Sequence, residues 1–400
     1  MLIYSSRNAF SVFFPSILDE FGWSRGGTAA MLSLNLLIYG LLAPVAGSFA
    51  GRSKPRRVML VGITVLGLAT AGCAFASELW QFYLFFGIMM PLGAAFSGWP
   101  LLSPTLANWF VKRRGLAISL GNMGAGLSFV YSIFVEFVIS HLGWRSAFLV
   151  MAGIMLAVIW PLYLFFFHYR PEDKGLRAYG ADELPEGDLV GDQSNMPGRD
   201  WTLSKAMKTY QLWFLVLSLS LYWGIGTYLV VAHQVKFAVD MGYDSMLAAS
   251  GFGLFGIGML AGHFGAPISD WIGREKTAAL GVALAVGGMV ALISIKDASQ
   301  PWLLYFYAIS FGFGAGLFSP TFFAGAADIF YGRHFGTISG LMLTGMGVSG
   351  VIGPWLGGYV YDISGSYNMA FMLSMVSIGL AGVSFWIAAP RNATRLRAKL

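Results

Sequence analysis

Residues 144–167 read WRSAFLVMAGIMLAVIWPLYLFFF. Arg145 is the only charged residue in this run, and nearly all the others are aliphatic or aromatic. A helix that crosses a lipid bilayer needs about 20 consecutive, mostly apolar residues. The run therefore predicts a membrane-spanning helix.

Eleven further runs of similar character occupy most of the chain. They lie near residues 1–18, 28–50, 57–77, 80–107, 115–140, 211–234, 246–268, 277–295, 301–326, 336–361 and 367–389. Apolar residues make up 56% of the 400 residues and charged residues only 11%, whereas soluble domains carry roughly 25% charged residues. The sequence thus excludes an ordinary soluble domain and predicts an all-α membrane protein with twelve transmembrane helices.

One long polar stretch, from about residue 170 to residue 208, interrupts this series and is rich in acidic residues, Gly and Pro. It predicts a cytoplasmic linker over 169–210 that joins two six-helix halves, 1–168 and 211–400. Near its end we expect a short helix at the membrane interface, with Thr202 as the N-cap.

Lys and Arg gather in every second loop. The basic loops hold Arg52–Arg57, Lys112–Arg114, the linker, Arg274–Lys276, Arg333 and Arg391–Lys399, whereas the alternate loops hold only Arg25, Arg145, Lys236 and Lys296. Cytoplasmic loops of membrane proteins carry such an excess of Lys and Arg. We therefore expect both termini in the cytoplasm and insertion in the plasma (inner) membrane. The net charge of +6 is then a topology signal, and no nucleic-acid partner is expected.

The two halves repeat one another. Residues 108–115 read NWFVKRRG, and residues 329–336 read IFYGRHFG. At the same offset, Gly93, Gly124 and Gly126 correspond to Gly314, Gly345 and Gly347. Two repeats of like orientation are typical of transporters whose halves rock about a central site.

Several stretches match a known family pattern. They are Arg7–Pro15 with Glu20–Arg25, Gly47–Arg57 with a second copy in Ser269–Arg274, Trp109–Ala117, Gly143–Phe148 and Arg170–Leu176. Through them the chain resembles the major facilitator superfamily and, within it, the branch of monocarboxylate transporters and oxalate/formate exchangers. The resemblance implies two six-helix repeats and secondary active transport by alternating access. It also implies a conformational latch at the cytoplasmic side, made by Arg52, Arg56, Asp270 and Arg274.

The chain departs from the family pattern at three places. Gly51 replaces the family's Asp in the loop between helices 2 and 3, while the second copy keeps Asp270, so we expect the latch to rest on the second half. Residues 260–265 lack the helix 8 Arg of many monocarboxylate transporters, and residues 336–362 lack the helix 11 Lys of oxalate exchangers. The family's anion site therefore does not transfer onto these two helices.

Arg7 is the first candidate for a binding residue, because ionisable groups deep in a bilayer cost about 2.5–3.5 kcal/mol on insertion scales. Asp19 is expected at the outer face, and twelve residues of helix put Arg7 about 18 Å below it, close to the midplane. This placement predicts a fixed cation that binds a substrate carboxylate. In the alternative interpretation Arg7 lies nearer the cytoplasm and snorkels towards water.

Glu136 and His233 are the candidates for proton coupling. Glu136 has only apolar neighbours in sequence near the outer end of helix 5, where burial would favour its protonated form. The alternative is a structural carboxylate paired with Arg145. A His titrates near physiological pH, which suits His233 to proton transfer, although a His near a helix end also serves as an interfacial hydrogen-bonding residue.

Aromatic residues with a polar group form a softer set of binding candidates. Tyr39, Trp99, Tyr131, Tyr222 and Tyr228 fall in helices 2, 4, 5 and 7, which line the cavity in this superfamily. We expect two of the five to face the pathway, with Tyr131 and Tyr228 positioning the carboxylate. The other rings then pack between helices.

Motifs for other chemistry are missing from the sequence. It has no nucleotide-binding loop, no metal-ligand cluster and no nucleophile–base pair near a membrane face, and the single Cys73 excludes an internal disulfide. We therefore expect no enzyme, no cofactor and no metal, but a monomeric, proton-coupled transporter of a small organic anion such as a monocarboxylate. Two alternatives stay open: an exporter of an apolar or cationic solute, and a non-transporting membrane sensor.

Overall fold

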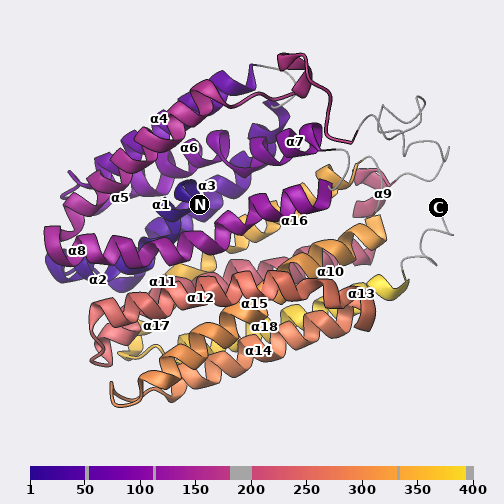
Figure 1. The fold of residues 1–400 in the computed structure, drawn as a ribbon. Helices are drawn as coiled ribbons and strands as arrows, with labels where there is room; N and C mark the ends of the chain where they lie inside the picture. Colours follow the sequence, from indigo (N-terminus) through magenta and orange to yellow (C-terminus); the bar gives the residue numbers. More distant parts are fainter. Residues whose placement is uncertain (50–53, 111–113, 181–200, 331–333, 393–400) are drawn as a thin grey trace.

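Long helices that run nearly side by side make up the protein (Figure 1). The computed structural model describes residues 1–49, 54–110, 114–180, 201–330 and 334–392. The first helices are α1 (Leu2–Asn8), α2 (Phe10–Phe21), α3 (Arg25–Phe49), α4 (Pro55–Cys73), α5 (Leu79–Phe82), the π-helix η1 (Tyr83–Met89), α6 (Met90–Ser97), α7 (Trp99–Trp109) and α8 (Arg114–Phe165). They are followed by α9 (Leu203–Met207), α10 (Tyr210–Leu219), the π-helix η4 (Ser220–Thr227), α11 (Tyr228–Asp240), α12 (Ser245–Gly265), α13 (Ser269–Ile272), α14 (Arg274–Ser294), α15 (Pro301–Phe330), α16 (Phe335–Ser349), α17 (Ile352–Ser364) and α18 (Asn368–Ala388).

The described helices account for twelve membrane crossings. Ten helical stretches are long and apolar enough to span a bilayer. One of them holds two spans, because Gly143 turns the chain inside α8 with φ 81° and ψ 159°, a conformation that favours glycine. The twelfth span is α1 with α2: each helix alone is too short to cross a bilayer, but only Ala9 separates them. The prediction of twelve helices is confirmed, but the expected single first helix is wrong in detail, since it consists of two pieces.

The two six-helix repeats meet along helices that carry glycine at the crossing points. Gly40 of α3 faces Gly347 of α16, and a Cβ added to Gly40 would lie only 2.7 Å from the Gly347 Cα. Gly126 of α8 faces Gly256 of α12, where an added Cβ on Gly256 would lie 2.5 Å from the Gly126 carbonyl oxygen. Small residues therefore allow the backbones of the repeats to touch.

The end of the linker forms the short helix expected from the sequence. Helix α9 begins at Leu203, and the Thr202 Oγ1 accepts a hydrogen bond of 3.3 Å from the Lys205 backbone N–H. The predicted N-cap is thus confirmed. Trp201 anchors this segment, because its ring packs edge-on against Phe330 at 5.1 Å.

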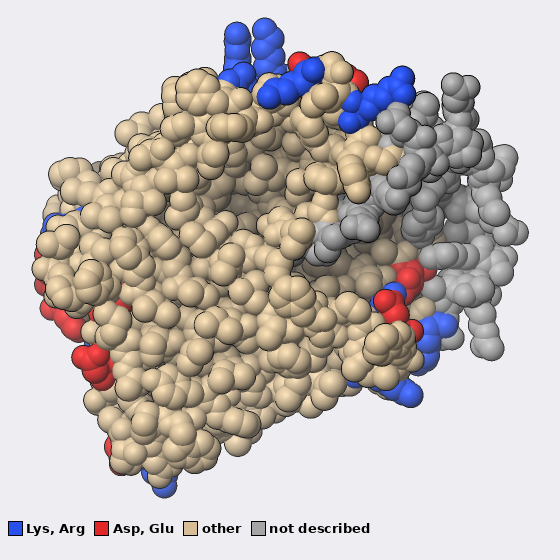
Figure 2. Space-filling model, viewed as in Figure 1, with Lys and Arg blue, Asp and Glu red and all other residues tan. Residues whose placement is uncertain are grey.

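The visible surface fits a protein embedded in lipid. Figure 2 shows a broad belt without Lys, Arg, Asp or Glu across the middle of this face. The charged side chains lie towards the ends of the helices, with most of the visible Lys and Arg near the end that carries the grey segments. We call that end the linker end and the opposite end, where α2 meets α3 at Arg25, the Arg25 end.

Candidate functional site

The guanidinium of Arg7 lies among three tyrosine rings. Its Cζ is 5.6 Å from the ring centre of Tyr4, 5.2 Å from Tyr39 and 5.7 Å from Tyr228. Tyr4 and Tyr39 come from α1 and α3 of the first repeat, whereas Tyr228 is the first residue of α11 in the second. Ring faces at such distances attract a cation. The structure thus places Arg7 where the two repeats meet and surrounds it with π-systems.

A small cavity opens beside Arg7 between α1, α3 and α6. Its polar lining is Tyr4, Ser6, Arg7, Asn35 and Tyr39, and its apolar wall includes Met90 and Ala94. The hydroxyl oxygens of Tyr4 and Tyr39 are 3.4 Å apart, a long hydrogen bond that either can donate. The cavity has room for about one water molecule. In this conformation it holds no space for a larger ligand.

Arg7 lacks an acidic partner among the described residues. None of the ion pairs found there involves Arg7, and its buried Nε has no hydrogen-bond acceptor. Burying a charge is expensive unless another group compensates it. Five N–H donors arranged as a planar fork therefore remain available to an anion.

Two π-helical segments lie directly before residues of this cluster. η1 ends at Met89, just before Met90 of the cavity wall, and η4 ends at Thr227, just before Tyr228. The Thr227 hydroxyl donates to the Tyr222 carbonyl oxygen five residues earlier, at 2.8 Å. π-helical turns are rare and often occur at functional sites, which supports the assignment of this region as the site.

The structure assembles only part of the aromatic set expected from the sequence. Tyr39 and Tyr228 contact Arg7, but neither Trp99 nor Tyr131 has its ring over the guanidinium. Tyr131 packs against Phe134 at 5.3 Å, and its buried hydroxyl has no partner. Trp99 lies beside Gly121, where an added Cβ would meet its ring at 3.2 Å.

Tyr4 and Asn35 are the site residues that sequence reasoning missed. Tyr4 lies three residues before Arg7, the spacing that brings two side chains to one face of a helix, so this signal was present. Asn35 is buried in α3, and its Nδ2 donates to the Phe86 carbonyl oxygen at 2.7 Å. A buried polar side chain in an otherwise apolar helix was the corresponding signal.

Glu136 is buried, with 4% of its surface exposed, but its environment differs from the expected one. Its carboxyl group lies near Ser245 and Asp244, at the start of α12. Arg145 instead pairs with Glu20, with the Nη1 and Oε1 atoms 2.5 Å apart. The alternative pairing of Glu136 with Arg145 is therefore wrong, because the two residues that follow Gly143, Trp144 and Arg145, both contact Glu20 of α2.

His233 is completely buried between the repeats, one and a half turns beyond Tyr228 on α11. Its Nε2 lies 2.8 Å from the Pro354 carbonyl oxygen and donates to it, which leaves Nδ1 without a partner. The ring packs edge-on against Phe14 at 5.2 Å and in a tilted arrangement against Tyr367 at 5.1 Å. It is separate from the rings around Arg7.

The latch residues expected from the family resemblance are described in part. Arg274 pairs with Asp270 at 2.6 Å and with Asp328 at 2.9 Å, and all three belong to the second repeat. Asp328 was not anticipated. Arg56 donates from Nε to the Tyr163 carbonyl oxygen at 3.2 Å, whereas Arg52 and the neighbouring Gly51 lie outside the described residues.

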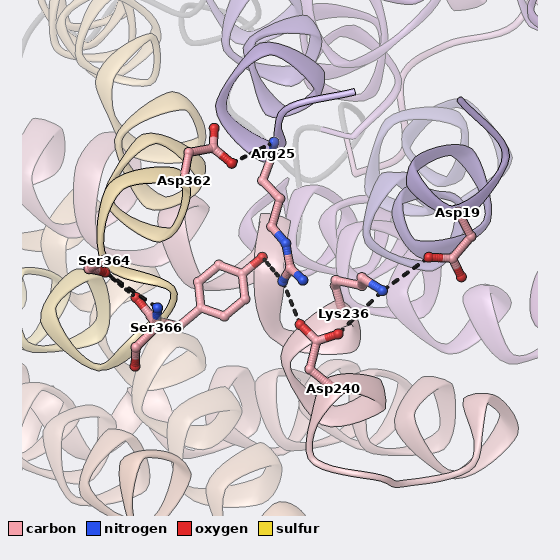
Figure 3. A network of polar contacts seen from close by, with 8 residues as sticks. Asp19, Arg25, Lys236, Asp240, Asp362, Ser364 and Ser366 are labelled. Atoms are coloured by element: carbon pink, nitrogen blue, oxygen red, sulfur yellow. Dashed lines mark hydrogen bonds and ion pairs between the residues drawn. The ribbon is translucent and has the colours of Figure 1, made fainter. Parts of the chain in front are cut away.

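Ionic contacts join the two repeats at the Arg25 end (Figure 3). The Arg25 Nη1 is 2.5 Å from Asp240 Oδ2 and 2.9 Å from the Tyr367 hydroxyl. The backbone N–H groups of Arg25 and Gly26 donate to the two carboxylate oxygens of Asp362 at 2.9 and 2.8 Å. Arg25 and Gly26 belong to the first repeat, and the groups they bind belong to the second.

A lysine extends this network to the first helix. Lys236 Nζ is 3.2 Å from Asp19 and 3.3 Å from Asp240 (Figure 3). We call Asp19, Arg25, Lys236, Asp240 and Asp362 the Arg25 cluster. Sequence reasoning treated its two cations only as topology signals. The contacts tie the two repeats together at this end.

Comparison with known proteins fits this architecture. The family model of the Major Facilitator Superfamily matches residues 1–342 and 264–399. The chain is 26% identical to human Monocarboxylate transporter 11 over 402 residues, covering 98% of this chain and 80% of that protein. It is 28% identical to the Probable sulfoacetate transporter SauU of Cupriavidus necator over 398 residues, covering 96% and 90%.

A solved structure shares the fold. The bacterial homolog of the human lysosomal transporter Spinster, in its inward-facing and unoccupied conformation, superposes with a TM-score of 0.69 at 17% identity, covering 100% of this chain and 95% of that one. Twelve membrane-spanning helices in two repeats and a family match over the whole chain lead to one conclusion. The chain is a multi-pass membrane transporter of a small molecule that belongs to the Major Facilitator Superfamily and is related to its monocarboxylate transporters.

Proposed function

We propose that this transporter carries a small organic anion, such as a monocarboxylate, and that Arg7 binds its carboxylate. The observation that carries the proposal is the guanidinium without an acidic partner where the two repeats meet. Two oxygens of a carboxylate match the fork of an arginine, and such pairs are among the stronger hydrogen-bonded contacts in proteins.

The names of two relatives agree with an anionic substrate. Monocarboxylates and sulfoacetate both carry a carboxylate. Helices 8 and 11 of this chain lack the basic residues expected from the family resemblance, so Arg7 on helix 1 takes the main role in this proposal. Tyr39 and Tyr228 form walls of the site, with Tyr4 and Asn35 added from the structure.

Alternating access explains how a ligand reaches a site that is now too small for it. The Arg25 cluster ties the repeats together, while the ion pairs of Arg274 stay within one repeat. The conformation is thus closed at the Arg25 end. Rocking of the halves, which we assign to 1–168 and 211–400, enlarges the cavity and exposes it to each side in turn.

The remaining assignments follow the sequence. The linker, 169–210, lies in the cytoplasm, the membrane is the plasma (inner) membrane, and the working unit is a monomer without a nucleic-acid partner. Glu136 and His233 carry proton coupling. Both are buried near the interface of the repeats, where a change in their surroundings accompanies any rocking motion. Asp270 and Arg274 form the conformational latch at the linker end.

Uptake by the purified full chain in proteoliposomes tests the function. The panel contains acetate, lactate, oxalate and sulfoacetate, with tetraphenylphosphonium as an apolar cation, and is measured with and without an inward proton gradient. We expect uptake of at least one carboxylate, stimulated by the gradient. Uptake of the cation alone would overturn the proposal in favour of an exporter of cationic or apolar solutes, and no transport of any compound in the panel would refute the small-anion assignment.

A further inference from the structure

The first membrane span, α1 with α2, and the seventh, which ends with η4 and α11, touch at the site and again at the Arg25 end. At the site, the Arg7 guanidinium of α1 faces the Tyr228 ring of α11 at 5.7 Å. At the Arg25 end, Asp19 of α2 pairs with Lys236 of α11 at 3.2 Å. Each contact joins the first repeat to the second. Eight residues of helix separate Tyr228 from Lys236, a rise of about 12 Å.

The helix that carries both second-repeat residues is continuous between them. Helix α11 runs from Tyr228 to Asp240 as regular α-helix, and it is directly preceded by the π-helix η4. Halfway along, the His233 ring packs on Phe14 of α2. A hydrogen-bonded helix moves as a unit, whereas a π-helical turn is a point where helix direction can change. A displacement of Tyr228 is therefore transmitted to the Arg25 cluster.

We propose that the cation–π contact between Arg7 and Tyr228 holds α11 against α1 and α2 and thereby keeps the ion pairs of the Arg25 cluster formed. An anion that binds Arg7 weakens this contact and allows the Arg25 cluster to open. The second half of this proposal rests on the anion site proposed above. The first half does not, because it concerns the empty protein. Tyr228 is in this view a positioning residue for the distant ion pairs as well as a wall of the site.

The physical reason is that one guanidinium serves two partners. A ring face attracts Arg7 because the cation is uncompensated, and the attraction weakens when a carboxylate neutralises it. Tyr4 and Tyr39 lose the same attraction, but they belong to the same repeat as Arg7 and do not hold the repeats together. Coupling between two sites is reciprocal. The factor by which a bound anion raises the equilibrium constant for opening the Arg25 cluster is therefore also the factor by which opening raises the affinity of Arg7 for the anion.

The test in the empty protein uses a spin-label distance across the Arg25 end. Cysteines replace Ser77 of the first repeat and Ser299 of the second, both exposed, in a Cys73→Ala background. Tyr228→Leu keeps an apolar side chain of useful size but removes the π-face. We expect the ratio of long to short distances to rise about two- to thirtyfold, which corresponds to the usual strength of a cation–π contact.

Two variants control for packing. Tyr228→Phe keeps the ring face and is expected to give the wild-type distances. Tyr4→Leu removes a ring at nearly the same distance from Arg7 but within one repeat, and it is expected to leave the distances unchanged. A Tyr228→Leu protein with wild-type distances, or a Tyr4→Leu protein that opens equally, would overturn the coupling. If Tyr228→Leu does not purify as a monodisperse protein, the anion affinity of Lys236→Met, described below, tests the coupling instead.

The anion arm uses acetate, lactate and sulfoacetate as probes. In the wild type a saturating anion is expected to raise the long-distance population, and in Tyr228→Leu it adds nothing further. Lys236→Met, which removes the ion pair with Asp19, is expected to bind the anion two- to thirtyfold more tightly although it is remote from Arg7. Unchanged or weaker binding by Lys236→Met contradicts the proposal. If the wild type binds none of the probes, the proposed anion site is refuted. The coupling between Tyr228 and the Arg25 cluster is then tested only by the spin-label distances in the empty protein.

Discussion

Gly40 and Gly347 touch across the two repeats: a Cβ added to either glycine would come 2.7 Å from the Cα of the other. Gly40 lies on α3 and Gly347 on α16, so this contact sets how closely these two helices approach. No side chain can move aside to relieve such a clash, because both partners are backbone atoms. The contact therefore exists only in a conformation in which α3 and α16 lie this close together.

Gly40→Ala is expected to destabilise this closed arrangement. Overpacking typically costs about 1–3 kcal/mol, so the thermal unfolding temperature of the detergent-solubilised protein falls and the repeats separate. Gly340→Ala, on the same helix as Gly347 but with open space where its Cβ would lie, is the matched control. Equal unfolding temperatures for Gly40→Ala and Gly340→Ala would contradict the argument.

Arg7→Gln is expected to lose anion binding while remaining folded. Losing one charged hydrogen bond costs about 1.5–3 kcal/mol, which is on the order of ten- to a hundredfold in affinity. Arg7→Lys keeps the charge without the planar fork, so it binds more weakly than wild type but better than Arg7→Gln. The measurement is the stabilisation of the purified protein by added anion. Binding of the native anion by Arg7→Gln within threefold of wild type would make Arg7 a structural residue.

Reversing the ion pair at the Arg25 end tests its role in closure. Arg25→Gln leaves Asp240 with Lys236 alone, so we expect more of the open conformation and easier labelling of a cysteine placed at Ser33, a buried residue of α3. The double variant Arg25→Asp with Asp240→Arg restores the opposite charges. Partial recovery of protection is the expected sign of a direct pair, and labelling rates identical to wild type in Arg25→Gln would rule out a closing function.

Glu136→Gln separates proton coupling from substrate binding. The amide keeps the size of the side chain and its capacity to hydrogen-bond with the nearby Ser245 but cannot carry a proton. We expect it to retain exchange of substrate for substrate across the membrane and to lose stimulation by a proton gradient. His233→Gln is tested alongside, since its ring also lies between the repeats. Gradient-driven uptake at wild-type rates in both variants would remove them from the coupling mechanism.

The orientation in the membrane can be tested by labelling single cysteines in the Cys73→Ala background. Glu172→Cys lies at the start of the linker and Ser366→Cys between α17 and α18. We expect an impermeant maleimide added to intact cells to label Ser366→Cys and to reach Glu172→Cys only after lysis. The opposite pattern would invert the topology, and equal labelling would argue against a fixed orientation.

Helix number and repeat order followed from the sequence because they depend on local properties. A membrane-spanning helix is recognised from the length of its apolar run. The linker that begins near residue 170 is recognised from its polar composition, without knowledge of where it lies in space. Arg7 was also accessible, since a charge in an apolar helix stands out in one dimension. The N-cap at Thr202 depends on three neighbouring residues and was predictable for the same reason.

Partners of the charged residues were not accessible in this way. Glu136 lies nine residues from Arg145, but Arg145 binds Glu20, 125 residues away. Arg25 meets Asp240 across 215 residues. Such pairs depend on the rotation of each helix about its axis and on the crossing of the repeats. One sequence without its relatives does not contain that information in readable form. For the same reason the sequence did not show that Tyr39 and Tyr228 lie over the Arg7 guanidinium while Trp99 and Tyr131 do not.

The π-helix before Tyr228 constrains how this chain can change in length. Its wider turn accommodates one residue more than an α-helix would over the same distance. Deleting a single residue from Ser220–Thr227 would therefore restore regular α-helix and leave Tyr228 beside Arg7 and Lys236 beside Asp19. The same deletion inside α11, which is regular α-helix, would turn everything beyond it by about 100° and move Lys236 away from Asp19. The segment before Tyr228 thus tolerates the loss of a residue, whereas the segment between the site and the Arg25 cluster does not.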